Sequence, residues 1–337
     1  MRPYRMAIII VSVFVMIWVT LTQLVLPIVV KKTLINRVQQ SCETCQLDIG
    51  QVGVGFFHLG SLSFTDVHLQ QGVRGAADLE ASVPRMEVVV NVFDVLSDNL
   101  HIDRFLVKKP DVMYTDGERP KPKAAESEGE SAEESKWNIH VKDFAVEDGT
   151  FTYRRVLHKE ASLLKLHSIN LKFLPFGSSI KRIEMRSQFQ LEKSGSIELN
   201  VATPWKSNQL EADVLVLIKN QNMADLNVFF KTNDGVILQG IMLDGRGEVN
   251  VRGSKLDAQV KAVYKDFQAK LIKNEDQSAA VAFFTTLGLK LVAKKDGTKR
   301  PKEDQVAKTS LKRKPNESLV HFILQGLKAA ALKVATN

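Results

Sequence analysis

The chain has 337 residues, of which 44% are apolar, 25% are charged and 7% are aromatic, with two cysteines and a formal net charge of +8. This composition excludes an intrinsically disordered chain, a collagen-like chain and a small disulfide-rich scaffold. The length is enough for about two domains of ordinary size. Charged and apolar residues are unevenly spread, and this divides the chain into segments of different character.

The first segment is a run of 25 residues without a charge, from Met6 to Val30. At about 1.5 Å per residue a helix of this length is roughly 37 Å long, enough to cross a bilayer core of about 30 Å. A cleaved signal peptide has a shorter apolar stretch followed by small residues, whereas this run ends in LPIVVKK. We therefore expect residues 1–32 to be an uncleaved membrane anchor, with the bulk of the chain on one side. Basic residues flank the run on both sides, so the positive-inside rule does not decide the orientation.

Two cysteines, Cys42 and Cys45, follow the anchor in a C-x-x-C arrangement. A redox site of this kind needs a strand before the pair and a helix after it, whereas a strand-like segment follows this pair. A zinc site needs two further ligands, and the seven histidines show no paired ligand spacing. The pattern favours a structural disulfide or unreactive thiols over redox or metal chemistry.

Between the anchor and residue 289 the dominant hydrophobic period is two, which is typical of half-buried strands. The pattern predicts about a dozen antiparallel strands, with helical periodicity near the two ends and in a short turn at 92–98. The alternating segments include 137–141, 169–173, 197–201, 226–230, 249–251 and 256–262, and the turn-forming pairs are Asp148-Gly149, Ser194-Gly195, Asp234-Gly235 and Asp244-Gly245.

An internal repeat supports the prediction of strands. We interpret each copy as a strand with an offset of two residues, then a turn, then a second strand that returns. Such a unit cannot bury its apolar face alone, so the copies are expected to stack. The residues Ile102, Phe105, Val107, Val112 and Tyr114 recur 39 residues later as Val141, Phe144, Val146, Phe151 and Tyr153, and Pro110 corresponds to Gly149.

An acidic stretch at 121–136 separates two β modules, which we expect at 33–120 and 137–289. Residues 124–136 hold five glutamates, one lysine and no large apolar residue. Such a composition cannot support a hydrophobic core, so the stretch is a linker or a long solvated loop.

A basic segment at 290–316 follows the second module, and residues 290–314 hold ten Lys or Arg against three acidic residues. It has no zinc-ligand spacing, recognition helix or aromatic RNA-binding strand, so we expect no nucleic-acid partner. The segment is a solvated loop or a contact for anionic lipid head groups. Residues 317–337 predict an amphipathic helix that plugs the end of the sheet or lies in a membrane interface. The expected lipid contacts are Lys294, Lys295, Lys299, Arg300, Lys312, Arg313 and Lys314.

The sequence contains none of the common catalytic motifs. The sequence lacks G-x-S-x-G, H-E-x-x-H, the Walker-type G-x-x-x-x-G-K-[ST] and G-x-G-x-x-G. We therefore expect no enzyme, no catalytic residues, no cofactor and no bound metal.

Five stretches after the anchor share a pattern of strands and short turns. They are 47–57 (LDIGQVGVGFF), 62–69 (LSFTDVHL), 86–96 (MEVVVNVFDVL), 100–112 (LHIDRFLVKKPDV) and 137–149 (WNIHVKDFAVEDG). Together with the anchor they resemble the start of AsmA-like bacterial envelope proteins. The resemblance covers residues 6–155, and it implies a single-pass protein of the bacterial inner membrane with its bulk in the periplasm, built as a twisted open sheet folded into a groove. Relatives of this kind, including the longer TamB and YhdP proteins, are associated with moving phospholipid to the outer membrane or with outer-membrane assembly.

The strand pattern is compatible with such a groove, since one apolar face of each strand can line it. In the alternative, the apolar faces close on each other as a sandwich or cover a helix, and the protein is an envelope scaffold that binds another envelope protein and no lipid. A dozen strands at about 4.8 Å extend about 58 Å, so the chain alone is too short to bridge two membranes. The residues expected to face lipid are Ile102, Phe105, Val107, Ile139, Val141, Phe144 and Val146.

Overall fold

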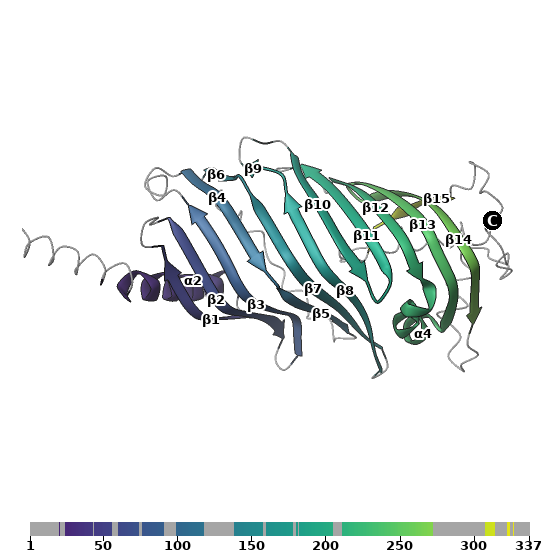
Figure 1. The fold of residues 1–337 in the computed structure, drawn as a ribbon, viewed down its shortest axis with the longest axis horizontal. Coiled ribbons are helices and arrows are strands. Elements are labelled where there is room, and N and C mark those ends of the chain that lie inside the picture. The colour runs from purple at the N-terminus through teal and green to yellow at the C-terminus, as the bar shows by residue number, and fades with distance from the viewer. Residues whose placement is uncertain are drawn as a thin grey trace, which may run out of the picture.

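The computed structural model describes residues 20, 24–42, 44–55, 60–73, 76–90, 99–117, 138–157, 160–177, 180, 182–204, 211–271, 307–313, 322–323 and 326. This part of the chain is mostly β, as predicted. Fifteen strands of the described residues form one sheet, accompanied by helices α2 (Leu26–Ser41) and α4 (Asn227–Asp234) and the short 3-10 helix η2 (Met223–Leu226) (Figure 1). The strands are β1 (Cys45–Val54), β2 (Ser61–Val73), β3 (Ala76–Val90), β4 (Asn99–Lys108), β5 (Asp111–Gly117), β6 (Asn138–Val141), β7 (Phe144–Leu157), β8 (Glu160–Phe173), β9 (Phe176–Gly177), β10 (Arg182–Leu191), β11 (Gly195–Pro204), β12 (Glu211–Asn222), β13 (Val236–Arg252), β14 (Lys255–Leu271) and β15 (Ala307–Lys312).

The fifteen strands lie in twelve lines, because β4 with β5, β6 with β7, and β8 with β9 are each two segments of one extended stretch. The lines follow chain order from β1 at one end of the sheet to β15 at the other (Figure 1). Strands from before and after the acidic stretch therefore pair directly in one sheet, through β4 with β7 and β5 with β7.

The 39-residue repeat explains this junction. Ile102 lies opposite Val141, Phe105 opposite Phe144, and Tyr114 opposite Tyr153, so the two copies pair residue for residue as parallel neighbours. The stacking of copies is confirmed, but the prediction of an antiparallel sheet throughout is wrong at this junction. The prediction of a turn and a returning strand is also wrong, since β5 continues β4 and β7 continues β6 in the same direction.

Bulges take the place of two predicted turns. Asp148-Gly149 lies within β7 and Asp244-Gly245 within β13, whereas Ser194-Gly195 does connect β10 to β11. A residue with positive φ inside a strand adds a kink and lets the strand continue, so an Asp-Gly pair alone does not show a reversal. Residues of this kind occur at Asp66 (φ 52°) in β2 and, beyond β3, in three neighbouring lines at Lys109 (φ 50°), Asp148 (φ 53°) and Ser168 (φ 50°).

Helix α4, with η2 before it, lies where a strand at 226–230 was predicted, and that prediction is wrong. The side chain of Asn222 accepts a hydrogen bond from the Ala224 backbone N–H at 3.1 Å, which caps η2. Gly235 ends α4 in the left-handed conformation at φ 61°. Met223 and Leu226 are buried at a helical spacing of three, a pattern that the local alternation of apolar residues concealed.

Helix α2 begins inside the predicted anchor and continues past its expected end at residue 32. Val30 and Ile35 pack against the strands, and the Lys31 Nζ donates to the Gly50 carbonyl at 3.2 Å. Cys42 ends the helix and forms a disulfide with Cys45, the first residue of β1, across a Cα separation of 5.3 Å. No helix within the described residues is long and apolar enough to cross a membrane, and Met6–Val30 falls largely outside those residues.

The far end of the sheet contains a strand within the predicted basic segment. Residues Ala307–Lys312 form β15 and pair with Lys255–Val260 of β14. Ala307 is buried, and the alternation of residues from Ala307 to Lys312 has the strand period, which the high local charge masked. Of the predicted C-terminal helix the structure describes Phe322, Ile323 and Gly326, which are helical, so the helix as a whole stays a prediction.

Candidate functional site

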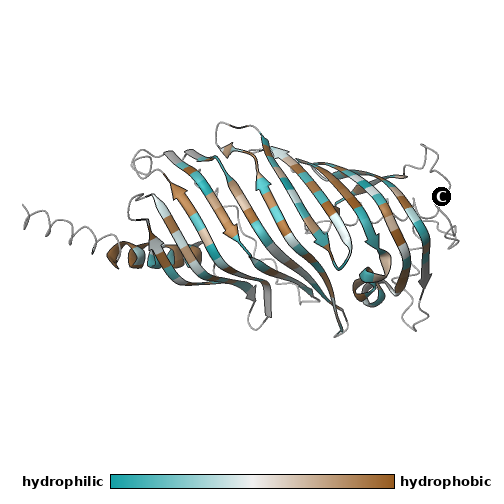
Figure 2. Cartoon of the chain, in the orientation of Figure 1, coloured by the Kyte–Doolittle hydropathy of each residue, from teal (hydrophilic) through white to brown (hydrophobic). Residues whose placement is uncertain are grey.

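One side of the sheet is apolar from end to end. Cross-strand partners that lie directly opposite each other point to the same side, so the register identifies each face. Hydrophilic and hydrophobic positions accordingly alternate along the strands (Figure 2). This whole side is called here the apolar face. One row of residues on it crosses all twelve lines and consists of Val52, Phe64, Met86, Val107, Val146, Leu171, Ser187, Leu199, Val216, Gly247, Val260 and Ala307.

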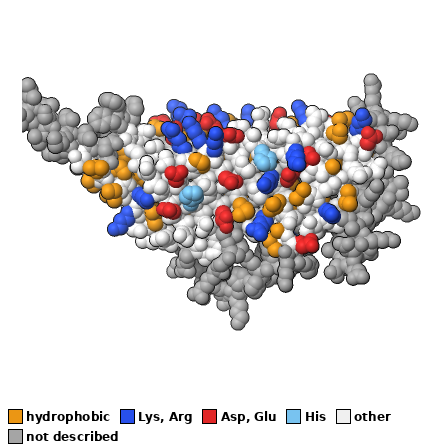
Figure 3. Space-filling model, turned by 60° about the horizontal axis from the view of Figure 1, so that its bottom comes forward, with side chains coloured by type: hydrophobic (Ala, Val, Ile, Leu, Met, Phe, Trp, Pro, Cys, Tyr) orange, Lys and Arg blue, Asp and Glu red, His pale blue; other side chains and the backbone are white. Residues whose placement is uncertain are grey.

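The opposite side of the sheet is called here the polar face. Its row next to the one above holds mostly polar and charged residues. It contains Gly53, Ser63, Glu87, Leu106, Ala145, Lys172, Arg186, Asn200, Leu215, Glu248, Gln259 and Lys308. Acidic and basic side chains are interspersed over the molecular surface in Figure 3. The sheet is therefore two-sided: most positions of this second row are polar or charged, and its two large apolar members are Leu215 and the fully buried Leu106.

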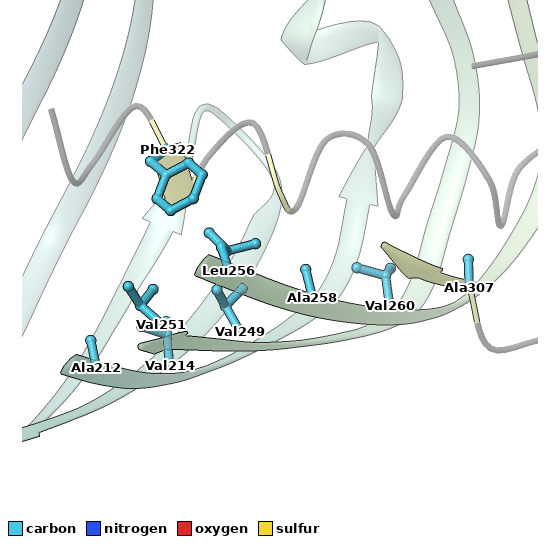
Figure 4. Close-up of a cluster of buried hydrophobic side chains, with 9 residues drawn as sticks. All are labelled: Ala212, Val214, Val249, Val251, Leu256, Ala258, Val260, Ala307 and Phe322. Carbon is cyan, nitrogen blue, oxygen red and sulfur yellow. The ribbon is translucent and has the colours of Figure 1, made fainter. Parts of the chain in front are cut away.

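Both ends of the apolar face are covered. At the β1 end, Val30 and Ile35 of α2 pack over a cluster that contains Ile49, Phe64 and Val67. At the β15 end, Phe322 is fully buried over strands β12 to β15, where its ring points toward Leu256 (Figure 4). The remaining members of this second cluster are Ala212, Val214, Val249, Val251, Ala258, Val260 and Ala307.

A third region of the apolar face, at one end of the strands, is covered by η2 and α4. Met223 and Leu226 of η2 are buried against Val236, Leu238 and Phe267, and Phe230 of α4 packs against this cluster. The Phe229 ring of α4 lies 5.7 Å from the Tyr153 ring of β7. α4 thus borders the apolar face without crossing its full width.

Between these covers the apolar side chains of β4 to β10 are only half-buried. Val107, Val112, Val146, Phe151 and Leu171 all retain partial exposure, and Tyr114 is 38% exposed. A covered face buries such residues completely, as at Leu256 and Val251 beneath Phe322. Within the described residues, the middle of the face has the exposure expected of a surface that is open to a ligand.

Aromatic rings line this middle region in two rows. Phe105 stacks on Phe144 at 4.9 Å, and Phe144 meets Phe173 edge-on at 4.9 Å. Nearer α4, Tyr114 stacks on Tyr153 at 6.1 Å. The equivalent rings of the two repeat copies are thus brought together by the parallel register.

The residues that the sequence predicts to face lipid lie on this apolar face where their side chains are described. Ile102, Phe105 and Val107 of β4 lie opposite Val141, Phe144 and Val146. Val141 is 5% exposed, so it belongs to the packed interior, whereas the other five are half-buried. Ile139 lies in β6 opposite Leu100, and its side chain falls outside the described residues.

A small polar cluster interrupts the apolar face near α4, and the sequence reasoning missed it. The Tyr153 hydroxyl donates to Asp116 Oδ2 at 2.7 Å. Burial, and then this hydrogen bond, raise the pKa of Tyr153 well above its ordinary value, so the hydroxyl stays protonated. Arg155 lies directly opposite Asp116 on the same face. The available signal was the pair Asp116 and Arg155 at apolar positions of the repeat.

The polar face carries an open depression of about 920 Å³ that spans β7 to β13. At its edge Asp213 binds two arginines, accepting hydrogen bonds from Arg182 and, at 2.6 Å, from Arg252. Burial opposes ionisation of Asp213, but the hydrogen bonds from Arg252 and Arg182 prevail and hold the pKa of this carboxyl below its ordinary value.

Of the expected anionic-lipid contacts, Lys312 and Arg313 lie at the β15 end, where the Arg313 backbone N–H donates to the Ser254 carbonyl at 2.9 Å. The other five, Lys294, Lys295, Lys299, Arg300 and Lys314, lie outside the described residues. Within the residues that the structure describes, no three His, Cys, Asp or Glu side chains form a group that could hold a metal ion.

No protein family model matches the chain, and no curated protein matches its sequence. The resemblance to AsmA-like envelope proteins therefore stays a prediction.

Proposed function

We propose that the protein is a non-catalytic lipid-handling factor of the bacterial envelope, in which the middle of the apolar face holds the acyl chains of a phospholipid. The observation that carries this proposal is the half-buried apolar surface of β4 to β10 between covered ends. Large exposed apolar patches on a folded protein mark binding surfaces, and a continuous row of side chains suits a long unbranched ligand.

The free energy of transferring an acyl chain is compatible with exchange of lipid between a membrane and the apolar face. Moving an acyl chain of about 16 methylene groups into water costs roughly 13 kcal/mol, at about 0.8 kcal/mol for each methylene. A bilayer and an apolar protein surface both avoid this cost. The apolar face therefore need only match the bilayer in apolarity for a lipid to pass between the two without a large change in free energy.

The β1 end is the end that we place at the inner membrane, with the sheet in the periplasm. The chain presents apolar side chains outward here, with Leu24 and Val25, just before α2, and Ile28 and Val29 of α2 between 49% and 67% exposed. Hydrophobic side chains gather at this end of the surface (Figure 3), and α2 runs along the long axis of the sheet (Figure 1). This arrangement supports a sheet that extends away from the membrane, as the AsmA-like resemblance implies.

The test is photo-crosslinking of the full-length chain in bacterial cells. A photoreactive phenylalanine at Phe151 samples the apolar face, and the same residue at Thr150 samples the polar face of the same strand. We expect phospholipid adducts at position 151 and none at 150, measured by mass spectrometry of the purified chain.

A matched pair of substitutions strengthens this test. Val146→Asp places a charge on the apolar face, and Ala145→Asp places the same charge one residue away on the polar face. Val146→Asp should lower the adduct yield at position 151 about tenfold or more, because a buried carboxylate is strongly disfavoured beside acyl chains. Ala145→Asp should leave it unchanged. Crosslinks from position 151 to a protein, with no lipid adduct, would instead support the envelope scaffold.

A further inference from the structure

We propose that Tyr114, Asp116, Tyr153 and Arg155 bind the head group of a phospholipid whose phosphate is followed by a primary ammonium, as in a phosphoethanolamine group. This inference rests on the proposed function and names the class of lipid that the apolar face selects. The four residues lie at the end of the face nearest α4, on the adjacent strands β5 and β7.

The parallel register places two opposite charges side by side. Asp116 lies opposite Arg155, and Tyr114 lies opposite Tyr153, on strands about 4.8 Å apart. Charged groups on an otherwise apolar face are costly unless something compensates them. A zwitterionic head group, which carries its two charges on neighbouring groups, compensates both.

Each charged side chain keeps unused hydrogen-bonding capacity. Asp116 accepts from the Tyr153 hydroxyl through Oδ2, and Oδ1 makes no hydrogen bond to a described residue. The Arg155 backbone carbonyl accepts a hydrogen bond from the Ser162 hydroxyl at 3.4 Å. The Arg155 guanidinium, which is half-buried, forms no hydrogen bond or ion pair with the described part of the chain.

The Arg155 side and the Asp116 side of the site suit different groups of the ligand, and this difference orients the head group. A guanidinium suits a phosphate, because its donors can engage two oxygens at once. The Asp116 carboxylate and the faces of the stacked Tyr114 and Tyr153 rings suit an ammonium. From Tyr153 the acyl chains would follow β7 past Phe151 to Val146, a distance of about 23 Å at 3.3 Å per residue.

The experiment measures the head-group composition of the adducts at position 151 in the full-length chain. Asp116→Asn removes the charge but keeps an oxygen that can accept from Tyr153, so the local fold is preserved. We expect it to lower the ratio of ammonium-bearing to anionic phospholipids about tenfold, as for the loss of one charge-assisted hydrogen bond. Asp111→Asn removes a charge from the opposite face of the same strand and should not change the ratio.

Arg155→Gln should lower the yield of every phospholipid adduct about tenfold, because all of them carry a phosphate, while Arg154→Gln on the polar face should not. If Asp116→Asn lowers the thermal midpoint, Tyr114→Leu tests the same ammonium site through its exposed ring. Phospholipid adducts with an unchanged ratio in Asp116→Asn or Tyr114→Leu would refute the head-group site alone. The absence of phospholipid adducts in the unsubstituted chain would refute the proposed function as well.

Discussion

The contact between the C-terminal segment and the sheet gives the sharpest stability prediction. A methyl group added at Gly326 would lie 2.5 Å from Leu256 Cδ2, closer than real carbon atoms approach. Leu256 and Phe322 are both fully buried, so there is little room for Leu256 to move away. The new methyl group of Gly326→Ala should therefore clash with the Leu256 side chain.

The magnitude has two parts of opposite sign. Overpacking a buried site costs about 1–3 kcal/mol. Replacing glycine by alanine inside a helix stabilises it by about 1 kcal/mol. Gly326→Ala should thus lower the free energy of unfolding by roughly 0–2 kcal/mol in the unsubstituted chain.

The Leu256→Ala background separates these two contributions. Leu256→Ala alone should cost about 2–5 kcal/mol, because it opens a cavity. In that background the new methyl group has space, so Gly326→Ala should stabilise the protein by about 1 kcal/mol or more. The helix contribution is the same in both backgrounds and cancels, so the coupling energy reports the contact, at about 1–3 kcal/mol.

The assay is urea denaturation of the full-length chain in a mild detergent, followed by far-ultraviolet circular dichroism. Val228→Ala, at a side chain that is 62% exposed, is the control and should change stability by less than about 0.5 kcal/mol. An equal effect of Gly326→Ala in both backgrounds would show that this segment does not pack on Leu256. The apolar side of the amphipathic helix predicted at 317–337 would then be available for a membrane interface.

Two further predictions concern local constraints. Reducing the disulfide between Cys42 and Cys45, or replacing both by serine, should lower stability by about 2 kcal/mol, the value expected for opening a loop of about four residues. Thermal midpoints with and without reductant should differ in the unsubstituted chain and coincide in the double-serine variant, and a midpoint insensitive to reductant would contradict this. Because the folded-state pKa of Asp213 is lowered, its two arginine pairs stabilise the fold above the ordinary carboxyl pKa, and this contribution is lost as pH falls through the lowered value. Asp213→Asn should be less stable by about 1 kcal/mol or less at pH 7, and the difference from the unsubstituted chain should shrink as the pH falls below the ordinary carboxyl pKa, a convergence that urea titrations over a series of pH values would reveal or rule out.

The sequence alone identified the class of fold and the positions that form its apolar face. Alternation with period two is a local property of a strand, so Phe105, Val107, Phe144 and Val146 were assigned to one face without knowledge of their neighbours. The same local logic failed at residues 226–230. There Leu226 and Phe230 also have the helical spacing of four, and the caps at Asn222 and Gly235, together with burial on one side, decided the outcome.

Only the tertiary structure decided how the strands pair and what lies on each face. The repeat showed that Tyr114 corresponds to Tyr153, but a repeat can stack in several ways, and the parallel register is a long-range choice that no local pattern encodes. That choice brings Asp116 beside Arg155 and the equivalent rings into contact. It also joins the two predicted β modules in a single sheet, because strand pairing depends on backbone groups that every residue carries.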